Sequence, residues 1–282
     1  MNKPVIITAD STCDISEKLK EQLQIAVLPL TVMEGDQAFK DGVDITPARI
    51  YDDYRQKGQL PKTAAISPQE FTDFFTPLVE KGCEVVHLDI SSKLSGSYQN
   101  ACISAMELEG IYPIDTTHLS SGMALMLLEA CRLRDEGRSA WEISEYLNAY
   151  REKVRTSFVV DTLEFIWKGG RCSGVTALGA NLLHIKPCLE MHDGELKVGK
   201  KYRGAMRKVY AQYIRDKLTT DDVDPRAAIL VNSGEIPEEV LEELAALAKE
   251  LVPFETFLTA QAGCTVCSHC GPGTVGMFYA VK

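Results

Sequence analysis

The sequence predicts an α/β protein of two domains. The first, residues 1–155, is expected to be a three-layer α/β/α domain with a parallel sheet, and the second, residues 156–282, an α/β domain with a mixed sheet. The chain has 282 residues, more than one hydrophobic core usually holds. Strand and helix patterns alternate in the first half. Near residue 156 this rhythm changes, and Asp193-Gly194 marks a tight antiparallel hairpin.

Short apolar runs in the first half predict strands at 5–8, 25–30, 84–90 and 111–115. A capping threonine before a proline, Thr46-Pro47, and the capping box Ser67-Pro68-Gln69-Glu70 mark helix starts. Further helices are expected over 96–109 and along the apolar stripe of Leu125, Leu128 and Cys131. This β-α alternation with short connections predicts a parallel sheet covered on both faces.

The second half begins after another capping box, Ser139-Ala140-Trp141-Glu142, whose helix is expected to end near Val154. Strands are expected at 157–160, 186–191 and 227–231, and helices at 203–218 and 238–251. Because the hairpin at Asp193-Gly194 requires antiparallel pairing, the sheet of this half is expected to be mixed.

Composition limits the classes of function. Hydrophobic residues make up 45% of the chain, which suits packed cores, and the net charge of -10 argues against a nucleic-acid binder or a polybasic membrane anchor. The N-terminus lacks the pattern of a signal peptide, and the apolar run Met123–Leu128 is too short to cross a bilayer. We therefore expect a cytoplasmic protein whose nine cysteines are reduced.

Gly194 to Lys200 almost matches a phosphate-binding loop. Lys201 stands where a serine or threonine would hold magnesium, and the segment follows a hairpin turn instead of joining a strand to a helix. A dinucleotide-binding glycine fingerprint and a kinase-type catalytic loop are also missing from the sequence. We predict a hairpin here and no cofactor.

Three cysteines, Cys264, Cys267 and Cys270, have a spacing that would suit zinc or an iron–sulfur cluster, with His269 among them. A structural zinc site needs four ligands, and the consecutive pair His269-Cys270 cannot easily point at one ion. We therefore predict buried thiols in a glycine-rich loop and no metal. A metal-sensing binding module remains an alternative.

The segment Ser91–Tyr98 contains the clearest functional signal. It follows a strand and opens a helix, where free backbone N–H groups and the helix dipole attract anions. Gly96 allows close approach of a ligand, and Ser95 and Ser97 add uncharged donors. An ordinary helix cap explains the same residues equally well. By contrast, Asp10-Ser11-Thr12-Cys13-Asp14 is explained by capping alone.

A serine hydrolase acting on acyl esters is the alternative function. Ser95 and His269 could supply a nucleophile and a base. However, the nucleophile motif Gly-x-Ser-x-Gly is absent from the sequence around Ser95, which is followed directly by Gly96.

Six stretches spread in order over nearly the whole chain resemble the DegV family of bacterial lipid-binding proteins. They are Asp10-Ser11-Thr12-Cys13-Asp14, Lys62-Thr63, Ser91-Ser92-Lys93-Leu94-Ser95-Gly96-Ser97-Tyr98, Asp161-Thr162-Leu163-Glu164 with Lys168-Gly169-Gly170-Arg171, Asn181-Leu182-Leu183-His184-Ile185-Lys186-Pro187, and His269-Cys270-Gly271-Pro272-Gly273.

The resemblance implies that the chain binds one long-chain fatty acid between its domains and is not itself an enzyme. Members of this kind present the acyl carboxylate to the separate catalytic subunit of a bacterial fatty acid kinase. Positions that hold the carboxylate match Thr63, Ser95 and Gly96, and positions near the pocket mouth or the partner surface match Arg171, Arg203 and His269. Transient contact with a membrane stays open, and no nucleic acid is expected.

The sequence departs from the family pattern in two places. Ala64 and Ala65 replace a serine and a glutamine that usually follow the threonine, which removes two polar groups near the head group. The cysteine trio replaces apolar and hydroxyl residues around His269. The first change bears on the head-group contacts of the ligand, and the second keeps the metal alternative open.

Overall fold

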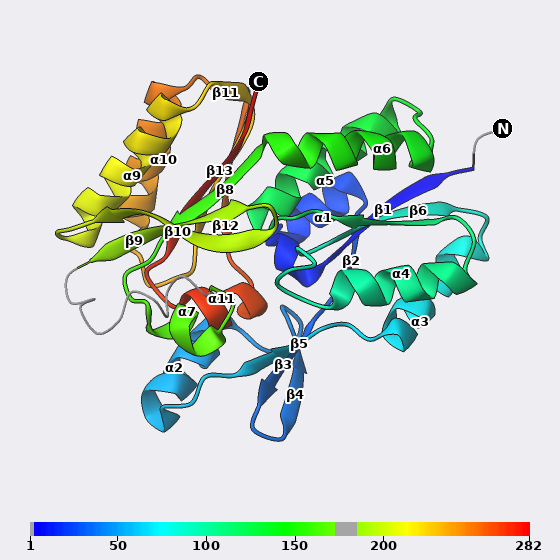
Figure 1. Cartoon of the computed structure of the whole chain (residues 1–282), viewed down its shortest axis with the longest axis horizontal. Helices are drawn as coiled ribbons and strands as arrows, with labels where there is room; N and C mark the ends of the chain where they lie inside the picture. The colour runs from blue at the N-terminus through cyan, green and yellow to red at the C-terminus, as the bar shows by residue number, and fades with distance from the viewer. Residues whose placement is uncertain (1–2, 173–184) are drawn as a thin grey trace.

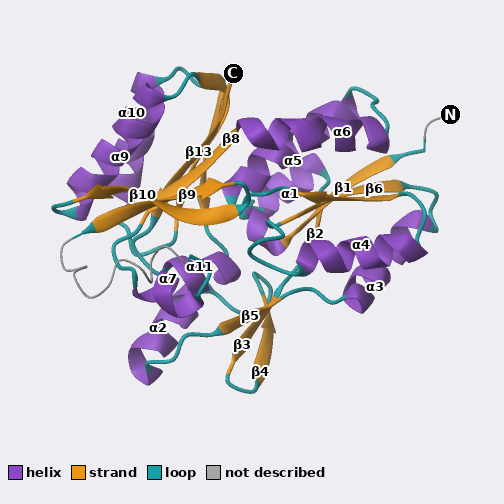
Figure 2. Cartoon of the chain, viewed as in Figure 1, coloured by secondary structure: helices purple, strands orange, loops and turns teal. Residues whose placement is uncertain are grey.

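The computed structural model describes residues 3–172 and 185–282. Within these ranges the chain forms a four-stranded sheet, a six-stranded sheet and a small three-stranded sheet, with helices packed around them (Figures 1 and 2). Helix α5 (Ser121–Asp135) contacts strands of both larger sheets. This is the two-domain α/β architecture that the sequence predicts.

The four-stranded sheet is parallel throughout, in the order β2-β1-β6-β7. Val85 belongs to a buried cluster with Phe71 of α3, whereas Val86 belongs to the cluster that holds Met123 of α5. Since successive strand residues point to opposite faces, α3 and α4 cover one face and α5 and α6 the other. The bounds are β1 (Val5–Asp10), η1 (Ser11–Cys13), α1 (Glu17–Leu23), β2 (Ala26–Leu28), α3 (Pro68–Val79), β6 (Glu84–Asp89), α4 (Ser97–Glu107), β7 (Ile111–Asp115), α6 (Ala140–Tyr150) and η2 (Arg151–Lys153).

The helix starts follow their sequence signals. The Ser67 hydroxyl accepts a hydrogen bond from the Glu70 backbone N–H, and the Glu70 carboxylate accepts from the Ser67 N–H at 2.9 Å, which completes the first capping box. The second box, at the start of α6, has the same arrangement. Thr46 caps α2 (Pro47–Lys57). These three predictions are confirmed.

The small antiparallel sheet was not predicted. It has the order β4-β3-β5 and consists of β3 (Thr31–Glu34), β4 (Gln37–Lys40) and β5 (Lys62–Ala64). The turn between β3 and β4 is Gly35-Asp36, a pair that can signal a two-residue hairpin. β5 pairs with β3 although helix α2 lies between them in the sequence. Only the folded chain therefore shows that Thr63 lies on a strand.

The six-stranded sheet is mixed, as expected, with the order β10-β9-β8-β13-β11-β12. Of the neighbouring strand pairs in this sheet, β11–β12 is parallel and the other four are antiparallel. Tyr279 packs in a cluster with α9 and α10, whereas the adjacent Phe278 packs in the cluster with α5. The bounds are β8 (Val154–Val159), α7 (Glu164–Gly169), β9 (Lys186–His192), β10 (Glu195–Tyr202), α9 (Met206–Thr220), β11 (Val223–Asn232), α10 (Glu238–Leu251), β12 (Thr256–Gln261), α11 (Cys264–Cys270) and β13 (Val275–Val281).

The hairpin between β9 and β10 turns at Asp193-Gly194, as predicted. Both residues have positive φ, 51° and 79°, which a two-residue turn of this type requires. Gly199 and Lys200 lie within β10, so the near match to a phosphate-binding loop is part of a hairpin.

One local prediction was wrong. The cysteine segment was expected to be a loop, but residues 264–270 form helix α11. The Asp41 carboxylate accepts hydrogen bonds from the backbone N–H groups of Cys264 (2.7 Å) and Thr265 (3.2 Å) at the start of this helix. The capping group thus lies more than 200 residues earlier in the chain, where a local pattern cannot reveal it.

The boundary between residues 155 and 156 stays a prediction. β8, the first strand of the six-stranded sheet, begins at Val154, but one buried cluster contains residues from both sides of this point. Residues 181–184 of the motif that ends at Pro187 lie outside the described residues. Among the helices of the described ranges, none combines the length and apolar character needed to span a bilayer.

Helix α5 packs against strands of both larger sheets. Ten of its 15 residues are buried. Gly122 lies so close to β8 that an added Cβ would stand 2.2 Å from Thr156 Oγ1. That hydroxyl shares a 2.9 Å hydrogen bond with His118 Nδ1. The absence of a side chain at Gly122 therefore sets how closely the second sheet approaches the helix.

We predict that Gly122→Ala lowers the free energy of unfolding by about 1–3 kcal/mol, because the new methyl group overpacks the contact with Thr156. Urea denaturation measures the change. In a Thr156→Ala background, which removes the crowded hydroxyl, the same substitution should cost less. An unchanged unfolding midpoint in the single variant would contradict this account of the interface.

Candidate functional site

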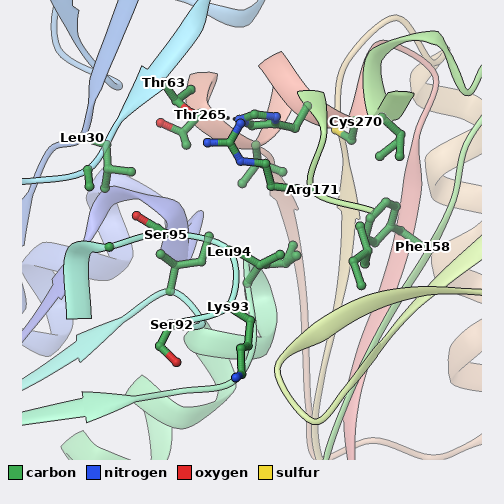
Figure 3. Close-up of a pocket in the computed structure, with 18 residues that line it drawn as sticks. Leu30, Thr63, Ser92, Lys93, Leu94, Ser95, Phe158, Arg171, Thr265 and Cys270 are labelled. Atoms are coloured by element: carbon green, nitrogen blue, oxygen red, sulfur yellow. Dashed lines mark hydrogen bonds between the residues drawn. The ribbon is translucent and has the colours of Figure 1, made fainter. Parts of the chain in front are cut away.

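A cavity of about 330 Å³ lies between the two domains. This volume is at the lower end of the range for small-molecule sites, roughly 300–1,000 Å³. Figure 3 shows side chains from both halves of the chain facing one another across it. The lining is mostly apolar and comprises Leu30, Thr63, Ala65, Ile90, Ser92, Lys93, Leu94, Ser95, Gly96, Leu119, Phe158, Ile166, Arg171, Leu196, Thr265, Val266, His269 and Cys270.

One wall is the segment that joins β6 to α4. It leaves the carboxyl end of a parallel strand, which is where open α/β sheets bind ligands. Gly96 is the N-cap of α4 and, as a glycine, makes no side-chain capping bond of its own. The Ser95 hydroxyl accepts from the Ser97 N–H at 3.3 Å and lies 3.0 Å from the Ser97 hydroxyl. The predicted anion site therefore has its donors on the cavity wall.

The opposite wall of the polar end contains Thr63 of β5 and His269 of α11. A hydrogen bond of 2.9 Å joins Thr63 Oγ1 and His269 Nε2, although the residues are 206 positions apart. Burial lowers the pKa of His269 to about 4, and the nearby Arg171 charge acts in the same direction. The ring is therefore neutral near pH 7. If its Nε2–H donates to Thr63, the threonine hydroxyl proton remains free to donate to a ligand.

The Asp10–Asp14 motif fixes the elements around the cavity. The Asp10 carboxylate accepts from the Ile90 N–H at 2.7 Å, immediately before the wall segment. Asp14 accepts from the Gly263 N–H at 2.7 Å, immediately before α11, and from the Ser120 hydroxyl at the start of α5. Burial raises the pKa of Asp10 to about 6 and that of Asp14 to about 8. The predicted local capping is present, since Asp10 also accepts from the Thr12 N–H at 2.8 Å at the start of η1. The bonds to Ile90, Gly263 and Ser120 join segments far apart in the sequence and were not predicted.

The two predicted arginines lie in different places. Arg171 is exposed and lines the cavity, and its guanidinium donates to the Gly169 carbonyl oxygen at 2.8 Å. Arg203 is exposed between β10 and α9 and does not contribute to the cavity lining. Thr63, Ser95, Gly96, Arg171 and His269 are therefore brought together around one cavity, and Arg203 is separate from it.

Of the two alanines that depart from the family pattern, one borders the cavity and the other does not. Ala65 lines the cavity, and its methyl carbon would lie 3.9 Å from a Cβ added to Gly96. Ala64 is not part of the lining. The missing polar group at residue 65 is thus next to the start of α4, where an anion would be held.

The cysteine trio is buried, as predicted, and Cys270 lines the cavity. Burial raises the pKa of Cys264 to about 12 and that of Cys267 well above its usual value. In the described part of the chain, no group of three His, Cys, Asp or Glu side chains is arranged to hold a metal ion. The prediction of no metal remains to be tested.

The geometry offers little to a serine hydrolase. Within the described residues, the Ser95 hydroxyl contacts Ser97, and the cavity histidine is bonded to Thr63. Some cavity residues were missed by sequence reasoning, among them Phe158 and Thr265. Their local patterns carry no signal, because the lining is assembled from segments far apart in sequence.

Comparison with known proteins identifies the family. A sequence profile of the DegV family, described as uncharacterised proteins, matches residues 4–282. Over 286 aligned residues the chain is 34% identical to a DegV domain-containing protein of Caldanaerobacter subterraneus subsp. tengcongensis, and the alignment covers 100% of both chains.

Solved structures agree with this result. A DegV family protein from Thermus thermophilus, described as fatty acid binding, is 31% identical with a TM-score of 0.88, and 100% of each chain is covered. The B3 protein of the Streptococcus pneumoniae fatty acid kinase, loaded with linoleic acid, is 22% identical with a TM-score of 0.84 and 99% coverage of each chain, a likeness that concerns the fold. Sequence profile, relatives and architecture lead to one conclusion: this chain belongs to the DegV family.

Proposed function

We propose that this chain binds one long-chain fatty acid in the cavity between its domains and performs no chemistry on it alone. The observation that carries the proposal is the division of the cavity wall. Hydroxyl groups of Thr63 and Ser95 lie at one end of the cavity, and the apolar side chains of Phe158, Ile166 and Leu196 from the second half of the chain also line it. Figure 3 shows Phe158 across the cavity from Ser95. An amphipathic ligand with one small anionic end suits this division.

The apolar wall supplies most of the affinity in this proposal. Burial of methylene groups contributes about 0.8 kcal/mol each, so a sixteen-carbon chain gains on the order of ten kcal/mol before the costs of binding. The fatty acid binding of the Thermus thermophilus relative, which is 31% identical over the whole chain, supports the same ligand class.

Neutral donors hold the carboxylate in this proposal. Thr63, Ser95 and the backbone at Gly96 can donate hydrogen bonds without forming an ion pair, and His269 is uncharged because burial lowers its pKa to about 4. A carboxylate held in this way keeps its nucleophilic character towards a phosphoryl donor.

We further propose that the carboxylate is presented to the separate catalytic subunit of a fatty acid kinase. The support is the motif resemblance together with the position of Arg171, which is exposed and borders the cavity. A guanidinium suits contact with a carboxylate or phosphate of a partner because it stays charged and binds in a planar fork. Arg203 belongs to the same proposed partner surface. A cytoplasmic location, predicted from the sequence, is part of this proposal.

The first prediction concerns the bound lipid. Protein expressed in bacteria should co-purify with about one fatty acid per chain, since the apolar cavity retains it through purification. Mass spectrometry of a solvent extract, calibrated against protein concentration, measures the ratio. An extract free of acyl chains, together with no uptake of added palmitate or oleate, would refute fatty-acid binding.

The second prediction concerns the head group. Thr63→Val combined with Ser95→Ala should weaken palmitate binding, because each change removes a hydrogen bond to a charged group worth about 1.5–3 kcal/mol. Calorimetric titration of delipidated protein measures affinity, and the unfolding midpoint shows whether the fold is intact. Equal affinity in parent and double variant would show that the carboxylate is held elsewhere.

The third prediction separates partner contact from lipid binding. With ATP, magnesium, fatty acid and a cognate kinase catalytic subunit, acyl-phosphate formation should require both proteins. Arg171→Ala and Arg203→Ala should lower the rate more than the affinity for lipid, because these side chains would meet the partner. Arg215→Ala, an exposed position on α9, is the matched control.

Two outcomes would contradict the division of labour. Phosphorylation by this chain alone would make it the enzyme. A loss of lipid affinity in step with the loss of rate would place the substituted arginine in the lipid site instead of the partner surface.

A further inference from the structure

Thr265 lies on the cavity wall one helical turn before His269. Residues four positions apart in a helix project from the same face, so the Thr265 side chain points to the side on which His269 reaches Thr63. α11 contacts β5, and Figure 3 shows Thr265 close to Thr63. Thr265 therefore belongs to the polar end of the cavity.

The Thr265 hydroxyl has no hydrogen-bond partner within the described ranges, although only 5% of the residue is exposed. Neighbouring hydroxyls behave differently: Ser268 Oγ donates to the Cys264 carbonyl oxygen at 2.7 Å, and Thr274 Oγ1 donates to that of Cys270 at 3.1 Å. A buried hydroxyl without a partner destabilises the folded protein. Such a group calls for an explanation, and a ligand oxygen in the cavity is one that can bond to it.

The position of this hydroxyl is fixed by contacts outside the cavity. The backbone N–H groups of Cys264 and Thr265 donate to the two oxygens of Asp41, which hold the first turn of α11 in place. A β-branched side chain in a helix has few rotamers. The backbone that carries the donor is therefore held in position independently of the ligand, and the side chain has few conformations to lose, which reduces the entropy lost on binding.

We infer that Thr265 donates a hydrogen bond to the fatty-acid carboxylate, as a third hydroxyl beside Thr63 and Ser95; this inference rests on the proposed function. A carboxylate offers about four lone-pair sites and can accept from three hydroxyls and a backbone N–H together. A neutral lipid alcohol has one oxygen and accepts weaker bonds. The site thus selects an ionised acid over the alcohol of equal length. Ala65 presents only a methyl group to the cavity, and Thr265 of α11 supplies a polar group from a different element.

The test compares delipidated parent, Thr265→Val, Thr265→Ser and Ser268→Ala. Palmitate and 1-hexadecanol affinities are measured for each by titration, and unfolding midpoints are measured without lipid. Thr265→Val keeps the shape and removes the hydroxyl. It should bind palmitate roughly tenfold more weakly or worse, and it should change hexadecanol affinity by less than about threefold. Its lipid-free midpoint should stay level or rise, because an unpaired buried hydroxyl is gone.

The two other variants control for folding. Thr265→Ser restores the donor and should bind palmitate within about threefold of the parent. Ser268→Ala removes a hydroxyl that is already bonded inside α11, so its midpoint should fall while palmitate affinity stays near that of the parent. Unchanged palmitate affinity in Thr265→Val overturns the inference. Equal losses for both ligands with a lower midpoint also overturn it, because they indicate a structural role.

The design distinguishes failure of this inference from failure of the proposed function. If the delipidated parent does not bind palmitate, fatty-acid binding itself is wrong, and Thr265 cannot have the inferred role. If the parent binds and Thr265→Val binds equally well, the function stands and only the role of Thr265 is rejected.

Discussion

The burial of helix α5 between two sheets is the constraint on which the rest of the structure depends. Ten of its 15 residues are buried, and residues 121–127 are buried without interruption, so this part of the helix has to be covered on all sides. The parallel sheet covers one side and the mixed sheet another, and Gly122 permits the close approach of β8. As a result, the carboxyl ends of β6 and β7 face the second domain. The segments that follow these strands, with Ser95 and Leu119, become walls of the cavity.

The chain uses one kind of interaction both to hold this edge together and, in the proposed function, to hold the ligand. Asp10, Asp14 and Asp41 are buried carboxyl groups that accept hydrogen bonds from backbone N–H groups and hydroxyls. Burial of an acid without a cation costs free energy, and hydrogen bonds from neutral donors offset part of that cost. The cavity offers the same neutral donors, through Thr63 and the start of α4.

In the proposed function, the end of the cavity that holds the carboxylate takes its hydrogen-bond donors from different elements of the fold. Ala65 lies beside Gly96 and contributes no polar atom, although the motif resemblance leads to the expectation of a polar side chain there. Thr265, on an element 200 residues later, faces the same end with a hydroxyl. A carboxylate has no fixed requirement for which element supplies its donors, only for their position and number.

The sequence by itself determined what depends on neighbouring residues. The parallel β-α half, the capping box at Ser67, the mixed second sheet and the hairpin at Asp193-Gly194 follow from local hydrogen bonds and from hydrophobic periodicity. Of the six site residues that the motif resemblance suggested, five line one cavity, whereas Arg203 lies apart.

Only the tertiary structure decided what depends on contacts between distant segments. In the three-stranded sheet, β3 pairs with β5 although helix α2 lies between them in the sequence. The first N–H groups of α11 donate to Asp41, a residue of the first half of the chain. The bond between Thr63 and His269 joins residues 206 positions apart. Local propensity contains no information about such partners, since the free energy that fixes them comes from burial and hydrogen bonds formed after the chain has folded.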